Sequence, residues 1–371
     1  MTNDMLGLIN IREDAPIIEL NERRPLATAP IGGRFRLIDF ALSNMVNAGV
    51  QDVGLLLPAA SRSILDHIRS GKEWGLARKG DGLFYLPMEP EEIGKPYEGD
   101  VATYYKNLTF VKRGNRKYIL ITDAHTVENI DFDDVLHFHR RHNADVTMIY
   151  QEMPKDCSEN GYSLTLEADD RVTGIVPQTQ FQTGDRQYQR TLLIDSEIFQ
   201  HYVRRAYAKG YKDMIDDVLK QNMTRLRVFG YKFSGYAKRV SSLSSYFQVN
   251  MDILHPKIWQ ELFLKDSQHH IYTKIKDEAP AKYMEEAHVT NSIIANGCVI
   301  EGRVENSVLF RKVHVGHNTV IRNCIIMQHS IIGDNADLNY VACDKSTIIQ
   351  PEAILAGTKD SPLCISKRSV L

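Results

Sequence analysis

Apolar residues along the first 255 positions alternate between short continuous runs and longer stretches with helical spacing. The runs predict β-strands at residues 5–9, 52–57, 117–122, 145–153 and 190–195. The stretches with helical spacing predict helices at residues 36–49, 61–71, 131–143 and 196–210. Strands that alternate with helices favour a mostly parallel sheet covered by helices on both faces, so this part of the chain predicts an α/β domain.

The helix expected at residues 36–49 carries one apolar stripe. Its members recur at helical spacing: Leu37, Phe40, Ala41, Met45 and Val46. Asn44 falls near the edge of this stripe, and Ala48-Gly49 is typical of a helix C-cap. We therefore expect Leu37 and Phe40 to be buried.

From about residue 285 a six-residue period replaces the helical one. Aliphatic residues stand six positions apart at Ile294/Ile300, Val315/Ile321, Ile326/Ile332/Leu338 and Ile348/Ile354. Such a repeat describes one flat side of a parallel β-helix, with three sides to a coil and the aliphatic side chain inside. We therefore predict a left-handed parallel β-helix, with an irregular β-sandwich as the alternative. Ile294, Ile300, Ile332 and Leu338 should be buried, and Ile326, Ile332 and Leu338 should share one face.

The change of period gives the expected domain organisation. Residues 1–255 form the α/β domain, residues 256–284 a partly helical linker, and residues 285–371 the hexapeptide-repeat domain. A chain of 371 residues is long enough for two such cores.

The net charge argues against some classes of binding partner, and the cysteine content bears on the cellular compartment. The formal net charge of −2 is no signature of polyanion binding, which argues against nucleic acid and anionic membranes as main partners. The chain shows neither a signal-peptide pattern nor an apolar run near the ~20 residues of a membrane span. Its cysteines are odd in number and far apart, as expected of reduced thiols in a cytoplasmic protein.

The loop after the first strand lacks the features of a phosphate cradle. Such a cradle needs backbone N–H groups that approach the anion closely, which glycine allows. Residues 10–20 contain no glycine and carry Glu13, Asp14 and Glu19. These carboxylates would repel a nucleotide triphosphate.

Several strings resemble the glucose-1-phosphate adenylyltransferases, or ADP-glucose pyrophosphorylases, of bacterial glycogen synthesis. The most specific is GGRFRLIDFALSN at residues 32–44. YEGDVATYYKNL, ILITDAH, YFQVNMDIL and the start of the β-helix match further family strings. The resemblance covers nearly the whole chain and implies a Rossmann-like nucleotidyltransferase domain followed by the left-handed β-helix.

The family's charged catalytic positions are mostly replaced here. The resemblance places Pro16 at the arginine that meets the triphosphate. It places Leu26 at the lysine of the family's R-A-K-P string. It places Gln178 at the sugar-phosphate lysine and Arg239 at the second metal-binding aspartate, while Asp123 keeps the first. Phosphoryl transfer between two anions needs cations and Mg²⁺.

These losses imply a regulatory, non-catalytic subunit type that activates a homologous catalytic subunit in a hetero-oligomer, as a tetramer. We then expect no catalytic residue, no metal and no cofactor in this chain, with Mg²⁺ only in the catalytic partner. One alternative is an active nucleotide-sugar nucleotidyltransferase with divergent residues. Another is a free sensor of a sugar phosphate or nucleotide.

Two groups of side chains leave the interpretation open. Arg23, Arg24, Arg34 and Arg36 could bind a regulatory sugar phosphate, or they could form a solvated basic surface or inter-subunit ion pairs. The histidines of HFHRRH do not all fall on one helical face, so a solvated, pH-sensitive face is favoured over a metal site.

Overall fold

The computed structural model describes residues 4–11, 24–58, 61–87, 99–154, 157, 159–265 and 268–371. Their packing divides the chain into two compact units. The first unit contains the described residues up to 11, from 40 to 237 and from 268 to 272. The second contains residues 24–39, 238–265 and 273–371. The second unit therefore combines the C-terminal region with two segments from earlier in the chain.

Four parallel strands form one side of the first unit's sheet, starting at the edge strand β5, in the order β5-β4-β1-β6. They are β5 (Gly82–Leu86), β4 (Asp52–Leu56), β1 (Met5–Asn10) and β6 (Tyr118–Asp123). In register, Leu8 of β1 lies between Gly54 of β4 and Ile121 of β6. This is the parallel arrangement that the alternating pattern predicts.

The sheet continues beyond β6 with mainly antiparallel pairings, so the whole sheet is mixed rather than mostly parallel as expected. β11 (Arg186–Asp195) is antiparallel to both β6 and β8 (Val146–Glu152), and β12 (Val228–Lys232) runs parallel to β8. β9 (Gly161–Leu166) and β10 (Val172–Gln178) form an antiparallel hairpin that extends the sheet. β7 (Thr126–Glu128) follows β6 closely in the chain.

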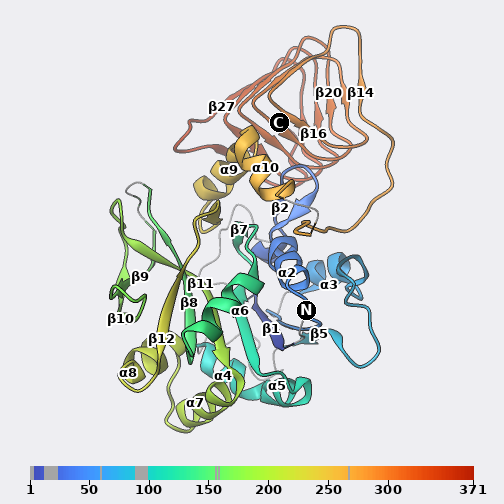
Figure 1. The fold of residues 1–371 in the computed structure, drawn as a ribbon. Coiled ribbons are helices and arrows are strands. Elements are labelled where there is room, and N and C mark those ends of the chain that lie inside the picture. The colour runs from blue at the N-terminus through green and yellow to red at the C-terminus, as the bar shows by residue number, and fades with distance from the viewer. Residues whose placement is uncertain are drawn as a thin grey trace. The chain divides into compact units, whose positions relative to one another are not determined.

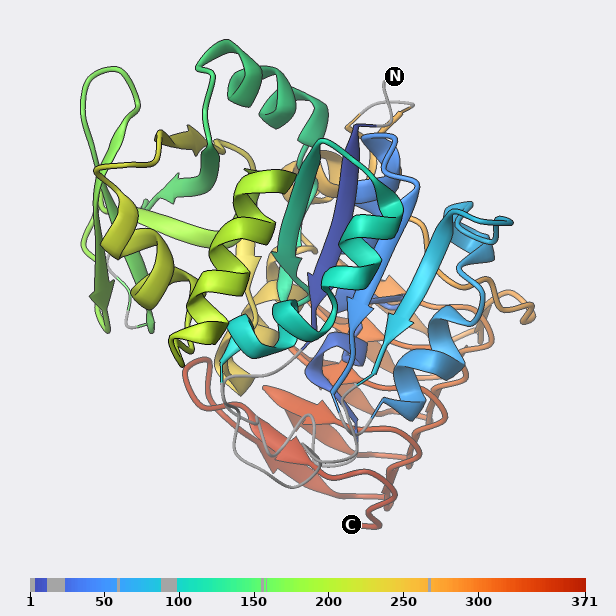
Figure 2. The same cartoon turned by 90° about the horizontal axis from the view of Figure 1, so that it is seen from below.

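Helices cover both faces of this sheet (Figure 2). On one face, α4 (Asp100–Lys106), α5 (Leu108–Gly114) and α7 (Ser196–Ala208) contribute side chains to a core cluster with Leu6, Leu8, Ile119 and Ile121. On the other face, α2 (Leu37–Asn47) approaches β1 so closely that a Cβ at Gly7 would collide with Met45. α6 (Phe132–Arg141) contacts β8, β11 and β12. The remaining elements of this unit are α3 (Arg62–Ile68), η2 (Lys72–Trp74), the π-helix η4 (Met214–Leu219) and α8 (Lys220–Asn222).

The strands and helices predicted in this region are confirmed, and α2 shows why. Leu37 and Phe40 are fully buried, while Val46 at the edge of the stripe is half-buried. Asn44 is buried as well, and its Nδ2 is satisfied there because it donates to the Glu128 carbonyl at 3.1 Å. Gly49 ends the helix with φ 73° and donates to the Val46 carbonyl, as the C-cap prediction requires.

Three five-stranded parallel sheets form the C-terminal part of the second unit (Figure 1). The first contains β14 (Lys282–Tyr283), β17 (Val299–Ile300), β20 (His314–Val315), β23 (Ile331–Ile332) and β26 (Ile348–Ile349). The second contains β15 (His288–Thr290), β18 (Arg303–Glu305), β21 (Val320–Arg322), β24 (Asp337–Asn339) and β27 (Ile354–Ala356). The third contains β16 (Ile293–Ile294), β19 (Val308–Leu309), β22 (Ile325–Ile326), β25 (Val341–Cys343) and β28 (Leu363–Ile365). The arrangement fits a left-handed β-helix, and the predicted fold class is confirmed.

The register of the coils differs in part from the simple six-residue prediction. Ile326, Ile332 and Leu338 are all buried, but they lie on three different sheets, so the expectation that they share a face is wrong. Each six-residue step turns a corner of the prism, and the third step has five residues in the coils from Leu309 to Ile326 and from Ile326 to Cys343. Residues stacked in one sheet, such as Val315 and Ile332, are therefore a full coil apart.

Because of the five-residue step, Ile348 and Ile354, the last pair predicted to point inward, point outward instead. Ile348 and Ile354 are 38% and 79% exposed, whereas Ile349 is buried in their place. Ile300 is buried as expected, and Ile294 is only half-buried because it lies in the first strand of its sheet.

Asparagines with positive φ stand at several corners of the coils. Asn291, Asn306 and Asn323 have φ between 43° and 52°, a region that asparagine tolerates better than most residues. The Asn291 amide donates to Asn306 Oδ1 of the next coil at 2.8 Å. Side-chain ladders of this kind link successive corners.

The rest of the second unit consists of short elements from the middle and the start of the chain. They are η1 (Leu26–Thr28), β2 (Pro30–Ile31), β3 (Phe35–Arg36), α9 (Leu243–Asp252) and α10 (Pro256–Phe263). β13 (Ala237–Arg239) lies at the division between the units. In the described part of the chain, no helix is both long enough and apolar enough to span a membrane.

The coil register gives a matched pair of substitutions. Ile332→Ala should lower the free energy of unfolding by about 2–4 kcal/mol, because it leaves a cavity inside the prism. Ile331→Ala, at the adjacent position with 47% exposure, should lower it by less than about 0.5 kcal/mol. Urea unfolding followed by circular dichroism measures both. Equal effects of the two substitutions would contradict the register.

Candidate functional site

Asp123, which the resemblance places at the family's first metal-binding aspartate, ends β6 in the first unit. Its Oδ1 accepts hydrogen bonds from the His125 backbone N–H at 3.0 Å and from Thr126 Oγ1 at 3.3 Å. The carboxylate therefore fixes the turn between β6 and β7. Asp123 thus has a structural role in this turn, whereas the sequence alone also allowed it to be a metal ligand.

Two buried carboxyl groups in the same unit have raised pKa values. Burial, and next the charge of Asp123, raises the pKa of Glu128 to about 8. Burial, and next the charge of Asp213, raises the pKa of Asp100 to about 8, although Asp100 Oδ1 accepts from the Met214 backbone N–H at 2.8 Å.

The remaining catalytic positions do not provide the missing groups. Leu26 is buried in η1 at 3% exposure, so an apolar core contact stands where the resemblance expects a lysine. Gln178 ends β10 and Arg239 ends β13. Pro16 lies outside the described residues. An arginine cannot ligate a cation, and the residues present therefore do not fit Mg²⁺.

The histidines of α6 differ from the expected solvated face. His139 is 1% exposed, its Nδ1 lies 2.8 Å from Thr147 Oγ1, and burial lowers its pKa to about 4. It is thus a neutral core residue, whereas His137 is exposed. Within the described ranges, no group of three or more His, Cys, Asp or Glu side chains is gathered as metal ligands.

A hairpin built from the most specific string lies in the second unit. β2 and β3 pair antiparallel, and Gly32 and Gly33 between them have φ of 55° and 79°. The Gly32 N–H donates to Asn250 Oδ1 of α9 at 3.0 Å, and the Tyr246 hydroxyl donates to the Pro30 carbonyl at 2.7 Å. A Cβ at Gly33 would lie 2.8 Å from Ile293 of β16, so the hairpin needs glycine there. These contacts fix the positions of Arg34 and Arg36.

Arg24, before the hairpin, is held by an ion pair. Its Nη2 lies 3.1 Å from Asp344 Oδ1 and 3.6 Å from Met327 Sδ, and its side chain is 9% exposed. Asp344 also accepts from the Lys345 backbone N–H at 2.6 Å. Of the expected arginines, Arg24 is therefore an internal ion-pair partner, and Arg23 lies outside the described residues.

Arg34 and Arg36 lie among other cations of the second unit. The Arg34 carbonyl accepts from Arg311 Nη2 at 3.2 Å. Burial and the charge of Arg34 lower the pKa of Arg311. Burial and the charges of Arg311 and Arg36 lower the pKa of Lys276.

The pKa of Lys345 is also lowered by burial and by neighbouring cations. Burial, and then the charges of Arg24 and Arg36, lower its pKa to about 7. We call the residues of this group the basic cluster: Arg24, Arg34, Arg36, Lys276, Arg311 and Lys345. Carboxylates near it include Asp39, Glu278 and Asp344, so positive charge is in excess. An anion bound there would relieve the mutual repulsion of the cations.

Sequence reasoning missed half of the basic cluster. Lys276 lies in the region expected as a linker, and Arg311 and Lys345 lie in turns between strands of the β-helix. The only local signal for Arg311 and Lys345 as members of the basic cluster is a charged residue in a turn of the repeat. Such a residue is equally typical of a turn exposed to solvent. The expectation that Arg24, Arg34 and Arg36 serve an anion stays a prediction.

Comparison with protein families gives two matches. A family model described as "Nucleotidyl transferase" matches residues 19–255. A second model, described as "GlmU-like, C-terminal hexapeptide", matches residues 279–360. Together they account for the α/β region and the β-helix.

Relatives match along nearly the full length. The "Glycogen biosynthesis protein GlgD" of Bacillus subtilis (strain 168) is 37% identical over 98% of this chain and 96% of the relative. The protein of the same name from Geobacillus stearothermophilus is 38% identical over 100% of this chain and 98% of the relative. A "Glucose-1-phosphate adenylyltransferase" of Clostridium botulinum (strain Eklund 17B / Type B) is 32% identical over 82% of this chain and 80% of the relative.

The pKa of Lys345 gives a pH-dependent prediction for the basic cluster. Lys345 is mostly protonated below pH 7 and mostly neutral above it. A phosphorylated ligand should therefore bind this cluster more tightly at pH 6 than at pH 8, by about 5- to 10-fold beyond the change due to the ligand's own titration. Isothermal titration with glucose 6-phosphate measures this. Lys345→Gln should weaken binding and remove the extra pH dependence, whereas Lys359→Gln, an exposed control, should not. Equal behaviour of the two variants would refute an anion site at Lys345.

Proposed function

This chain belongs to the nucleotidyl transferase family, as a relative of the GlgD glycogen biosynthesis proteins, and we propose that it is a regulatory subunit of glucose-1-phosphate adenylyltransferase. In this proposal it has little or no activity of its own and activates a homologous catalytic subunit. The catalytic subunit converts ATP and glucose-1-phosphate to ADP-glucose and diphosphate. The product supplies glycogen biosynthesis.

The observation that carries the proposal is the loss of charge at each step of this reaction. Leu26 is a buried core residue, Gln178 is neutral, and Arg239 has the wrong sign for a metal ligand. Asp123 remains but accepts two hydrogen bonds from its own turn. Because each lost phosphate or metal contact raises the barrier by a few kcal/mol, their combined loss reduces the rate by many orders of magnitude.

An active nucleotidyltransferase with divergent residues is the competing proposal. It requires other groups to replace the missing cations and metal ligands in the first unit. Of the two positions that the resemblance assigns to metal ligands, Asp123 keeps a carboxylate and Arg239 does not. This argues against metal-assisted chemistry in this chain, and we propose Mg²⁺ only in the catalytic partner.

A regulatory subunit acts through its surface. One side of the β-helix presents an apolar row in which Ile331 is paired with Ile348, and Ile348 with Val370. These three residues are 47%, 38% and 58% exposed. We propose this row as part of the surface that binds the catalytic subunit in a hetero-oligomer, as a tetramer.

The basic cluster supplies a second route of control. We propose that it binds an effector such as a sugar phosphate or a nucleotide, because its cations outnumber the nearby carboxylates. An effector changes activity only if it binds the active state of the assembly more tightly than the inactive state. We also propose the cytoplasm as the location, in keeping with five cysteines that are odd in number and far apart in the sequence.

The pure chain should form no measurable ADP-glucose from ATP and glucose-1-phosphate. Arg239→Asp alone should not restore activity, because residues 11–16 still lack glycine and the arginine that meets the triphosphate. A coupled diphosphate-release assay measures both proteins, with a catalytic glucose-1-phosphate adenylyltransferase as the positive control. Turnover within about tenfold of that control would favour the competing proposal.

Co-expression with a catalytic subunit should give a stable hetero-oligomer on size-exclusion chromatography. A preference of about 1–3 kcal/mol for the partner's active state would raise its activity roughly 5- to 150-fold. Ile331→Lys combined with Ile348→Lys should weaken the assembly, because it places charge in the apolar row. Ile354→Lys is the matched control, since this exposed isoleucine lies in a different sheet. Separate elution of the unsubstituted chains at micromolar concentration, with unchanged kinetics, would leave the proposal without support.

A further inference from the structure

A cavity of about 320 Å³ lies in the first unit, between α7 and the segment formed by η4 and α8. It is far in sequence from every residue of the basic cluster, and all its lining residues fall between 202 and 225. The catalytic resemblance assigns no residue to it. Its volume is at the lower end of the range for small-molecule pockets, which is roughly 300–1,000 Å³.

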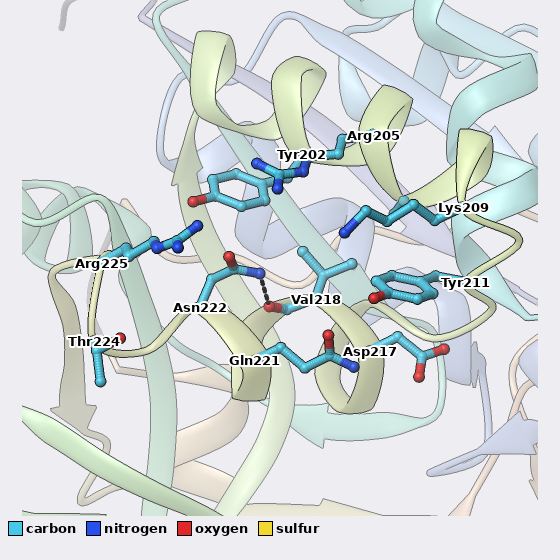
Figure 3. A pocket seen from close by; sticks show the side chains of 11 residues that line it. Tyr202, Arg205, Lys209, Tyr211, Asp217, Val218, Gln221, Asn222, Thr224 and Arg225 are labelled. Carbon is cyan, nitrogen blue, oxygen red and sulfur yellow. Dashed lines mark hydrogen bonds between the residues drawn. The ribbon is translucent and has the colours of Figure 1, made fainter.

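Three cations from two sides line this cavity. Arg205 lies in α7, Lys209 is the residue that caps the end of α7, and Arg225 lies beyond the end of α8; all three side chains are exposed. Figure 3 shows the charged ends of Lys209 and Arg225 directed toward each other across the space between the helices. Like charges that face one another favour an anion between them.

The one acidic side chain in the lining is already engaged. Asp217 Oδ2 accepts from the backbone N–H groups of Lys212 and Asp213 at 2.8 and 3.0 Å. These bonds use the carboxylate to hold the turn before η4. The cavity therefore keeps a net positive charge.

Aromatic and amide groups complete the lining. Tyr202 and Tyr211 are half-buried, and Lys209 Nζ lies 5.3 Å from the centre of the Tyr211 ring. Asn222 donates through Nδ2 to the Val218 carbonyl at 2.7 Å, which fixes the direction of its amide, with Oδ1 able to accept from a hydroxyl group (Figure 3). Tyrosine faces pack well against a sugar ring, and an amide oxygen accepts from its hydroxyls.

One wall of the cavity is a π-helix. η4 spans Met214–Leu219, and Asp213 caps it by accepting from the N–H groups of Ile215 and Asp216 at 2.7 Å each. π-helical turns are rare and occur often at functional sites. Here the wide turn contributes Asp217 and Val218 to the lining.

We propose that this cavity binds a monosaccharide phosphate. Arg205, Lys209 and Arg225 hold the phosphoryl group, and Tyr202 and Tyr211 contact the sugar ring. Charge-assisted hydrogen bonds to the phosphoryl oxygens supply the affinity, and the ring contacts distinguish a sugar phosphate from free phosphate. This binding site is additional to the proposed regulatory function and to the basic cluster.

Hydrogen–deuterium exchange measured by mass spectrometry on the full chain locates the binding. Glucose 6-phosphate should protect peptides that span residues 198–226, and glucose alone should not. Inorganic phosphate should protect them only at concentrations at least tenfold higher. Arg205→Gln and Arg225→Gln should each weaken this protection about tenfold.

Arg204→Gln is the matched control, because Arg204 is adjacent on α7 but lies outside the lining and bonds Gln200 Oε1 at 3.1 Å. Arg204→Gln and Lys345→Gln should leave the protection unchanged, which separates this cavity from the basic cluster. Absence of protection at millimolar glucose 6-phosphate, or an equal loss in Arg204→Gln, would overturn the proposal. Equal protection by inorganic phosphate and glucose 6-phosphate would overturn the assignment to a sugar phosphate.

Discussion

A hydrogen bond between two distant segments positions much of the second unit. The Gly32 N–H donates to Asn250 Oδ1, and the Tyr246 hydroxyl on the same helix holds Pro30. Gly32 belongs to GGRFRLIDF and Asn250 to YFQVNMDIL, so two of the strings that mark the family resemblance meet at this contact. Both strings therefore serve packing in this structure, because the hairpin they fix sets the positions of Arg34 and Arg36.

The catalytic positions are subject to a different constraint. Joining two phosphate-bearing substrates requires fixed cations and a metal, and these serve the reaction rather than the fold. In our proposal Leu26 stands at one such position, and its side chain is buried in an apolar core. We propose that this chain has kept the scaffold and lost the chemistry. What remains useful is the surface of the scaffold and its excess of positive charge near the hairpin.

The sequence predicted the elements well because apolar periodicity reflects burial directly, as Leu37 and Ile332 show. It failed where position depends on geometry between elements. A five-residue step from Leu338 to Cys343 reversed the inside and outside positions of Ile348 and Ile349, which no single hexapeptide reveals. Lys345 joins Arg24 only through the folding of the β-helix. The buried state of His139 depends on Thr147 in the neighbouring strand, and a helical wheel cannot supply that.

The central claim is that turnover in the assembly belongs to the partner alone. The most direct measurement is the rate of ADP-glucose formation by a hetero-oligomer whose catalytic subunit has been inactivated at its own metal-binding aspartate. Our account predicts a rate indistinguishable from background, while the same oligomer with an intact catalytic subunit turns over faster than that subunit alone. Substantial ADP-glucose formation by the oligomer with the inactivated partner would place chemistry in this chain and contradict the account.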